Sequence, residues 1–293
     1  MRFLERHGSL GRDPFLWRWA QRGIRLVELP SVAPEHRDEL RTAKLLAVVF
    51  NVLVDDVADV ERDAALLGRL AAVPFAGALR SARPREGEAP REDRREGWAR
   101  ELWQGIEARA RALPLARELW PALRFDYDQV FTCMRYSVLI NEEPWLLNAQ
   151  EHRLYAPHNM NMMVFATLDL MASPGVPREE WGLVRGAFVH AQAMGQLSNM
   201  MVTWEREIAA RDVSSGVFAE ALDAGSLDPA AIASLPPREL HARMLASGAE
   251  ARLLAHWHQH RASFARLAGR VRSLDLESLL AGLDELLRSA QAA

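Results

Sequence analysis

LLAVVFNVLVDDVADV, at residues 45–60, joins an almost uninterrupted apolar run to a group of three aspartates. The apolar run at 45–54 is about half of the roughly 20 residues needed to cross a bilayer, so it predicts a buried helix. Three carboxylates at the end of a core helix repel one another at short range. The stretch therefore predicts a helical core whose carboxyl end carries chemistry.

The aspartates, DDVAD at 55–59, have a spacing that suits a bridging cation. Asp55 and Asp59 share one helix face, about 6 Å apart in rise, while Asp56 lies about 100° round the helix. Mg²⁺ prefers carboxylate oxygens, keeps several waters and is commonly completed by substrate phosphates. We therefore predict Mg²⁺ ligands at these three positions. An exposed acidic helix end is the alternative that the motif alone leaves open.

A second oxygen-rich pattern, NMMVTWERE, lies at 199–207 within a strongly helical segment. Asn199, Thr203 and Glu207 are spaced four apart, and each step of four rotates only about 40°, so the side chains line one stripe. Amide, hydroxyl and carboxylate oxygens are hard ligands that suit Mg²⁺. Alone, the pattern also fits a plain polar stripe, but two facing clusters of this kind can clamp a diphosphate.

The rest of the chain indicates an all-α fold. Its 293 residues are 49% hydrophobic and 26% charged, as in a typical globular protein, and strong helix formers fill most segments. We expect one helical domain over 1–293, with a charged loop at about 81–96 and a flexible loop at about 212–236. The predicted helices cover about 36–60, 62–73, 97–112, 115–133, 135–155, 158–172, 177–210, 237–248, 250–271 and 274–290.

Charge and cysteine content indicate which kinds of partner and which cellular compartment to expect. The 36 basic and 39 acidic residues give a net charge of −3, which offers no footprint for nucleic acid. Cys133 is the only cysteine, so no intrachain disulfide can form, and the first ten residues lack the continuous apolar core of a signal peptide. We expect a cytoplasmic protein that neither binds nucleic acid nor inserts stably into a membrane.

In combination, the two motifs resemble those of class I terpene synthases, the single-domain bacterial terpene cyclases. DDVAD at 55–59 matches the aspartate-rich DDxxD motif of that family. NMMVTWERE at 199–207 matches its Asn-Ser/Thr-Glu triad, with Met200 in place of a frequent but non-ligating aspartate and Arg206 on the basic position before the glutamate. The resemblance implies a helical bundle around a central active-site cavity and a cluster of three Mg²⁺ ions.

The segment before the second motif supplies a third match. Arg153 lies 46 residues before Asn199, the spacing of the family's pyrophosphate sensor. Pro157 resembles the helix break that follows the sensor and turns a backbone carbonyl toward the reacting carbon. Independently of the family, a guanidinium binds phosphate bidentately and a carbonyl dipole stabilises developing positive charge. A surface salt bridge between Arg153 and Glu151 or its neighbours is the alternative left open.

The sequence also departs from the family. The family's C-terminal Arg-Tyr pair has no counterpart, because the last tyrosine of the chain is Tyr155, and Arg261 and Arg266 are candidates to replace it. The acidic residue that often follows the sensor is missing as well, with Ala156 in that neighbourhood. The link between diphosphate binding and ionisation is therefore the least predictable part of the site.

The helical turn before the aspartates supplies the expected wall of the substrate pocket. Asn51 and Val52 lie four and three residues before Asp55 and so share its face, which predicts that they point from the metal rim toward the substrate. Phe50 lies about 140° away from Asp55 and should pack behind the helix.

These observations predict a Mg²⁺-dependent terpene cyclase that ionises an isoprenyl diphosphate, with farnesyl or geranylgeranyl diphosphate as the expected substrate. Arg153 and Arg206 are expected to stabilise the departing diphosphate. Three alternatives stay open: a diterpene synthase that ionises an already cyclised diphosphate, a chain-elongating prenyltransferase and a non-enzymatic helical binding protein. A prenyltransferase normally carries two aspartate-rich motifs, whereas the second motif here is Asn-Thr-Glu. Formation of a homodimer also stays open.

Overall fold

The computed structural model describes residue 10, residue 12 and residues 14–76 and 94–291. Within these residues the chain forms helices and no strand, which confirms the all-α class. The α-helices are α2 (Pro14–Leu26), α3 (Arg37–Asp56), α4 (Ala64–Ala72), α5 (Arg94–Arg111), α6 (Ala116–Glu142), α7 (Ala149–Tyr155), α8 (Met162–Met171), α9 (Arg178–Ala210), α10 (Gly216–Asp223), α11 (Pro229–Ser234), α12 (Pro237–Ser247), α13 (Ala249–Ala268) and α14 (Glu277–Gln291). The shorter elements are the 3₁₀ turns η1 (Pro34–His36), η3 (Val73–Phe75), η4 (Pro144–Leu146) and η5 (Ala156–Met160) and the π-helical turn η2 (Val57–Glu61).

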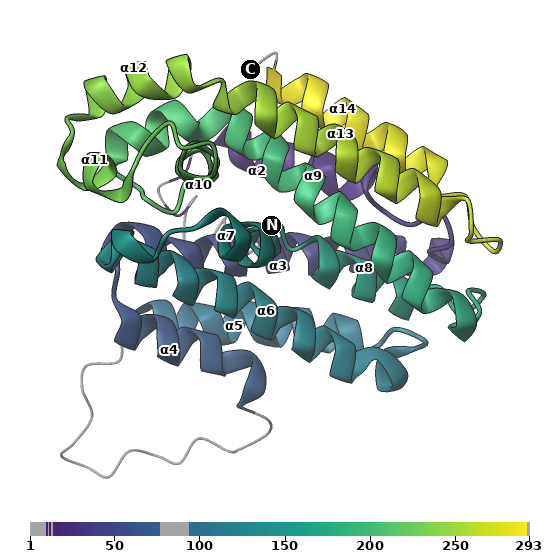
Figure 1. Cartoon of the computed structure of the whole chain (residues 1–293). Coiled ribbons are helices and arrows are strands. Elements are labelled where there is room, and N and C mark those ends of the chain that lie inside the picture. Colours follow the sequence, from purple (N-terminus) through teal and green to yellow (C-terminus); the bar gives the residue numbers. More distant parts are fainter. Residues whose placement is uncertain (1–9, 11, 13, 77–93, 292–293) are drawn as a thin grey trace, which may run out of the picture.

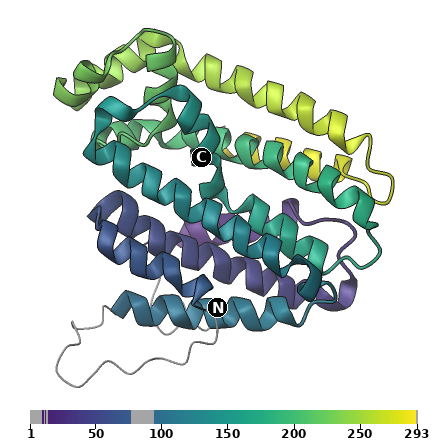
Figure 2. The same cartoon turned by 60° about the horizontal axis from the view of Figure 1, so that its bottom comes forward.

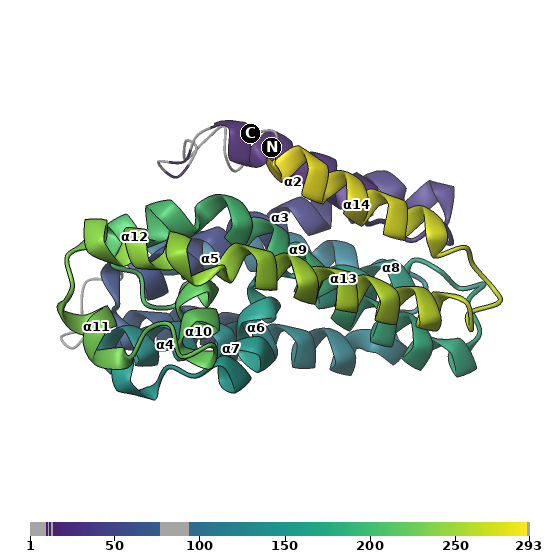
Figure 3. The ribbon, with the colours of Figure 1, turned by 45° about the horizontal axis from the view of Figure 1, so that its top comes forward.

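The helices form a layered bundle around α9, which spans 33 residues. Helices α13 and α14 pack along one side of α9, and α8 packs on another (Figure 1). Helices α3 and α5 lie on the opposite face of the bundle from α13 and α14 (Figure 2). Helix α2 lies at the outer edge of the bundle, beside α14 (Figure 3). Segments from both ends of the described chain therefore lie side by side.

Burial follows the apolar pattern of the sequence. The run expected to form a buried helix lies in α3, and its buried side chains are Leu45, Ala47, Val49, Phe50, Leu53 and Val54. Every residue of α8 is buried, as expected for a helix that is surrounded on all sides. The main core is formed where these two helices meet α5, α6 and α9.

The loop expected at about 212–236 is wrong, because α10 and α11 form within it. Their apolar side chains, among them Phe218 and Ile232, build a second, smaller core together with Trp204 of α9. The side chain of Asp228 accepts a hydrogen bond from Ala231 N and caps α11. Helices of eight and six residues are too short to show a clear helical period, so the Gly, Ser and Asp residues around them resembled a loop.

Several boundaries also differ from the prediction. Helix α6 runs without a break through 133–135, and the chain leaves it only after Glu142. The helix expected over 135–155 is interrupted by η4 until the side chain of Asn148 caps α7. Of the loop expected at 81–96, residues 94–96 begin α5 and the remainder lies outside the described residues.

The helices that carry the two motifs end at the same place in the bundle. The π-helical turn after α3 ends at Arg62 (φ 55°), and α9 ends at Arg211 (φ 55°), so both ends use a left-handed residue. The guanidinium of Arg62 donates to the carbonyl of Arg211 at 3.3 Å. This contact joins two positions that are 149 residues apart. No helix in the described residues combines the length and the hydropathy that a membrane crossing requires.

Candidate active site

The aspartate motif lies where α3 changes into the π-helical turn η2. Asp55 and Asp56 belong to the last residues of α3, and Asp59 lies in η2, whose Val57 and Ala58 are buried in the core. Short π-helical insertions occur often at functional sites. The buried pair anchors the turn and leaves the three carboxylates at the rim of the bundle.

The protonation of the motif is governed by burial and by mutual repulsion. Burial raises the pKa of Asp55 to about 6, and the charges of Asp56 and Asp212 add to the rise, while a hydrogen bond from Asn159 opposes it. The pKa of Asp59 is raised well above its usual value by burial and then by Asp55 and Asp212. Asp55 and Asp59 thus carry repulsion that a bound cation would remove.

Asp56 has a different environment from the other two carboxylates. Its side chain forms an ion pair with Arg12. Burial raises the pKa of Asp56, and the charge of Arg12 opposes that rise. Asp56 is therefore partly neutralised by the protein itself, and Asp55 and Asp59 are the members of the motif that are freer to bind a cation.

The second motif lies along the last turns of α9, as its spacing predicts. Burial raises the pKa of Glu207, and the nearby hydroxyl groups of Ser215 and Thr203 oppose the rise. The hydroxyl of Thr203 also donates to the carbonyl of Asn199 at 3.0 Å. Arg206 is exposed, and its charge helps to lower the pKa of Glu207. The oxygen atoms of the motif therefore lie on one stripe of α9.

Asp212 is a carboxylate of the site that the sequence analysis missed. It lies just after α9, where its Oδ1 accepts from Asn141 Nδ2 at 3.1 Å and from the backbone N–H of Ser214 at 2.9 Å. Its charge raises the pKa of carboxylates in both motifs, namely Asp55, Asp59 and Glu207. Asp212 therefore lies between the two motifs. The only feature of the sequence that could have identified Asp212 is that it is an acidic residue shortly after the second motif.

The residues of this site fit Mg²⁺ that is completed by phosphate. Asp59 Oδ1 and Glu207 Oε2 are buried and have no hydrogen-bond partner in the described structure. Across all the residues that the structure describes, no three His, Cys, Asp or Glu side chains converge on one point that could hold an ion. Mg²⁺ usually keeps several waters and takes one or two carboxylates plus substrate phosphates, so an all-protein cage is not needed.

Arg153 forms a salt bridge, but its partners differ from the one expected. Its guanidinium binds Glu220 at 2.9 Å and Asp223 at 2.8 Å, both on α10. Glu151 instead accepts a hydrogen bond from Asn148 at 2.7 Å. The expected partner Glu151 is therefore wrong, but the salt bridge itself is present, with two carboxylates of α10. Arg153 is bound to the element that directly follows the second motif.

Pro157 lies at a break between α7 and α8, as predicted. The break is the 3₁₀ turn η5, followed by Asn161 in a left-handed conformation (φ 57°). The carbonyl of Ala156, just before the proline, accepts a contact from the Cys133 thiol at 3.6 Å. Burial raises the pKa of that thiol, with Asp55 and Asp59 contributing. The helix break therefore lies directly behind the aspartate motif.

The side chains before the aspartates are arranged partly as predicted. Phe50 is buried and packs edge-on against Tyr127 and Phe131 of α6, which confirms that it lies behind α3. Asn51 donates from its amide to the backbone carbonyl of Asn159 at 2.8 Å. Val52 is half-buried against the main core. Asn51 thus contacts the helix break, which the spacing alone did not indicate.

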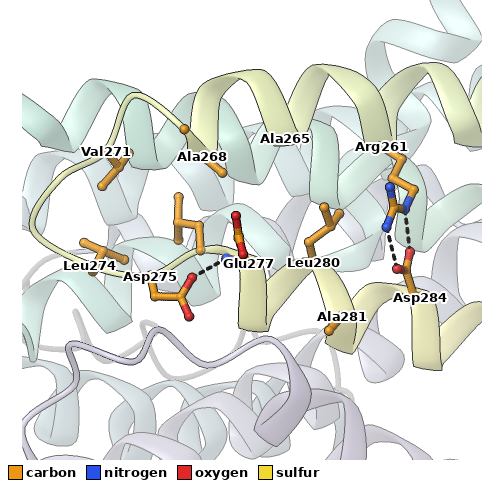
Figure 4. A pocket seen from close by; sticks show the side chains of 12 residues that line it. Arg261, Ala265, Ala268, Val271, Leu274, Asp275, Glu277, Leu280, Ala281 and Asp284 are labelled. Atoms are coloured by element: carbon orange, nitrogen blue, oxygen red, sulfur yellow. Dashed lines mark hydrogen bonds and ion pairs between the residues drawn. The ribbon is translucent and has the colours of Figure 1, made fainter.

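Arg261 and Arg266 do not reach the carboxylates. Arg261 forms two hydrogen bonds with Asp284, both at 2.8 Å, beside a cavity of about 480 Å³ between α13 and α14 (Figure 4). Arg266 donates to Ser263 on its own helix. Neither arginine is therefore placed at the carboxylates of the two motifs.

The cavity beside Arg261 lies at the other end of α9. Glu180, at the start of α9, accepts hydrogen bonds from the backbone N–H groups of Arg272 and Ser273 in the turn between α13 and α14. With a rise of 1.5 Å per residue, Glu180 and Glu207 are about 40 Å apart along the helix. The cavity is therefore not the space between the two motifs.

Comparison with known proteins was made at the level of sequence and of structure. No protein-family model matches the sequence, and no curated protein matches it. In structure, the chain is similar to the linalool/nerolidol synthase of Streptomyces clavuligerus, which was crystallised with 2-fluorogeranyl diphosphate. The match covers 99% of this chain and 95% of that one, with a TM-score of 0.60 and 14% sequence identity. The chain therefore has a class I terpene synthase-like fold.

Proposed function

We propose that the protein is a Mg²⁺-dependent terpene cyclase that ionises an isoprenyl diphosphate and closes the resulting allylic cation into a ring. One observation carries the proposal. The oxygen-rich motifs on α3 and α9 end side by side, joined by the contact between Arg62 and Arg211, in a fold shared with a terpene synthase. Farnesyl and geranylgeranyl diphosphate are the substrates we favour.

In this proposal the two motifs hold the diphosphate through metal ions. Asp55 and Asp59 on one side, and Asn199, Thr203 and Glu207 on the other, supply the protein ligands, with Asp56 in support. Bound Mg²⁺ supplies Lewis-acid stabilisation of the negative charge that develops on the leaving diphosphate. The buried, unpartnered oxygens of Asp59 and Glu207 are the atoms that gain most from such a cation.

Two arginines complete the binding of the leaving group. Arg153 and Arg206 donate hydrogen bonds to the diphosphate as the C–O bond breaks and its electron pair leaves with the phosphate oxygen. The carbon left behind is an allylic cation, and the carbonyl at the Pro157 break turns its dipole toward that charge. Loss of a proton, or capture of a water, ends the reaction in a hydrocarbon or an alcohol.

A single set of incubations tests the proposal. Purified protein with Mg²⁺ is offered diphosphates of 10, 15 and 20 carbons and a pre-cyclised diterpenyl diphosphate, and extracts are analysed by mass spectrometry. We expect a terpene product together with released diphosphate, and we expect EDTA to abolish both. A longer prenyl diphosphate as product would instead indicate a prenyltransferase. Product formed only from the pre-cyclised substrate would indicate the diterpene synthase alternative, and no diphosphate release from any of them would leave a binding protein.

A further inference from the structure

Asn159 connects the helix break to the aspartate motif. It lies in η5, two residues after Pro157. Its Nδ2 donates to Asp55 Oδ1 at 2.8 Å. Its backbone carbonyl and its Oδ1 both accept from the amide of Asn51, at 2.8 and 2.9 Å. One residue of the break is therefore bound to α3 through three hydrogen bonds, two of them made by its side chain.

The network fixes which way the Asn159 amide points. An asparagine amide has an acceptor end and a donor end, and the acceptor end already receives the N–H of Asn51. The donor end must then face Asp55. Asn51 and Asp55 lie one turn apart on the same face of α3, so both ends of the amide are held by one rigid helix.

We infer that Asn159 is a positioning residue that orients the Asp55 carboxylate for metal binding and ties the aspartate motif to the helix break. This inference rests on the proposed function. With Oδ1 held by Asn159, the other oxygen of Asp55 is the one presented to a cation. Groups that hold a metal-binding carboxylate in place in this way typically contribute 10- to 100-fold to metal affinity or activity.

The same contact supplies a connection that the sequence lacks. An acidic residue was expected just after Arg153, and Ala156 lies there instead. Asn159 provides a different route, because it lies in the same 3₁₀ turn as Ala156 and Pro157 and binds the first aspartate directly. Asn159 therefore couples the position of Asp55 to the turn that holds Pro157.

The test measures metal binding without turnover. Thermal unfolding is followed at fixed inorganic diphosphate while the Mg²⁺ concentration is varied, for the wild type and for Asn159→Ala. We expect the wild type to be stabilised as Mg²⁺ rises, and Asn159→Ala to need about 10- to 100-fold more Mg²⁺ for the same half-maximal effect. The same rightward shift is expected in the Mg²⁺ dependence of turnover.

Asn148→Ala is the matched control. Asn148 also uses its side chain in hydrogen bonds on the helix that leads into η5, because it caps the start of α7 by accepting from Glu151 N at 2.9 Å. Its loss should lower the melting temperature but leave the half-maximal Mg²⁺ concentration unchanged. A normal Mg²⁺ response in Asn159→Ala, or an equal shift in Asn148→Ala, would overturn the inference.

Asn51→Ala provides a second route if Asn159→Ala does not fold. Because Asn51 acts on Asp55 through Asn159, its removal should shift the Mg²⁺ response in the same direction, and the double variant should be no worse than Asn159→Ala. Additive shifts would show independent roles and contradict the inference. A wild type that ignores Mg²⁺ and diphosphate would overturn the proposed function, and the inference with it. A responsive wild type with an equally responsive Asn159→Ala would overturn the inference alone.

Discussion

The guanidinium of Arg153 binds Glu220 through two N–H groups, Nε at 3.1 Å and Nη2 at 2.9 Å. Glu220 is only 5% exposed, whereas Arg153 is 37% exposed. His256 Nδ1 also lies 3.3 Å from the same carboxylate. If Arg153 binds diphosphate, it exchanges a carboxylate on α10 for a phosphate. In the proposed function, Arg153 would thereby link α10, which follows the second motif, to the leaving group.

Arg153→Ala should lower both activity and stability, by separable routes. Loss of a charged hydrogen bond to diphosphate should reduce kcat/KM about 10- to 100-fold. The buried Glu220 left with fewer donors should lower the free energy of unfolding by about 1–3 kcal/mol. Steady-state kinetics and urea unfolding measure the two effects.

The double variant Arg153→Ala/Glu220→Gln separates these effects. Replacing the carboxylate by a neutral amide removes the unpaired charge, so much of the stability should return while kcat/KM stays low. Recovery of both would show that Arg153 acts only through the salt bridge with α10.

The fold could be predicted from the sequence where apolar residues repeat over several turns. The prediction for α9 was 177–210 and the helix spans Arg178–Ala210. The expectation failed at α10 and α11, because helices of only about two turns take their stability from tertiary packing, and their sequences show no clear helical period. Phe218 acquires its burial where α9 and α12 pack on α10, and Ile232 where α11 meets η4.

The site could be predicted only where its residues share one helix. Spacing alone placed Asp55 with Asp59, and Asn199 with Thr203 and Glu207, because positions four and eight apart share a helix face. It could not find Asn159 or Asp212, since their roles depend on a contact across 104 residues in one case and on the meeting of two helix ends in the other. Neither of these long-range contacts produces a periodic pattern in the sequence.

Asp55→Asn should stabilise the metal-free protein while abolishing activity. Because the folded pKa of Asp55 is raised to about 6, the folded protein binds more protons than the unfolded chain between about pH 4 and 6, so the free energy of unfolding falls as pH rises through that window. Above about pH 6 the buried Asp55 carboxylate is charged and its full destabilising effect is present, and the neutral amide of the variant removes this effect. We expect a gain of about 1–3 kcal/mol at pH 7.5 together with turnover lowered by orders of magnitude.

Asp128→Asn, at an exposed position on α6, is the control for Asp55→Asn and should change neither property. Asn199→Ala should also lose turnover, with an unchanged far-UV circular dichroism spectrum. Wild-type rates in Asp55→Asn or Asn199→Ala would remove that motif from the set of metal ligands.

Phe50 and Val52 should give opposite phenotypes. Phe50→Ala deletes an aromatic side chain packed among Trp103, Tyr127 and Phe131, so it should destabilise the protein by about 3–5 kcal/mol with little change in product. Val52→Phe should instead narrow the substrate pocket and shift products toward shorter or less cyclised ones. Product analysis by mass spectrometry and urea unfolding separate the two. An altered product pattern in Phe50→Ala alone would mean that the face of α3 is assigned wrongly.

Lys44 is the only lysine of the chain. It should contribute to stability mainly by compensating the charge of the buried Asp169, not by its packing. Its Nζ lies 2.5 Å from Asp169 Oδ1, and both side chains are fully buried. Lys44→Met leaves a buried carboxyl group uncompensated and should cost about 3–5 kcal/mol in unfolding experiments. Lys44→Met/Asp169→Asn should recover most of that loss, because the amide still accepts from Leu29 N. Equal losses in the single and double variants would show that Lys44 packing, not charge, is what matters.

His152 should make the protein sensitive to acid. It is 4% exposed, and its ring nitrogen Nε2 lies 3.1 Å from the carbonyl of Ser214. Burial lowers its pKa to about 4, with Arg153 contributing. The unfolded chain therefore binds more protons than the folded protein below about pH 6.5, so the free energy of unfolding falls as pH falls from 6.5 to 4.

His152→Gln isolates this contribution, because glutamine does not titrate and its amide can still donate to Ser214. Relative to His152→Gln, the wild type should lose about 3 kcal/mol more between pH 6.5 and 4 in urea unfolding. Other titrating groups act equally in both proteins and cancel in the difference. His258→Gln, at an exposed position on α13, should show the full wild-type slope. Parallel slopes for the wild type and His152→Gln would mean that the buried imidazole accepts a proton in the folded state without cost.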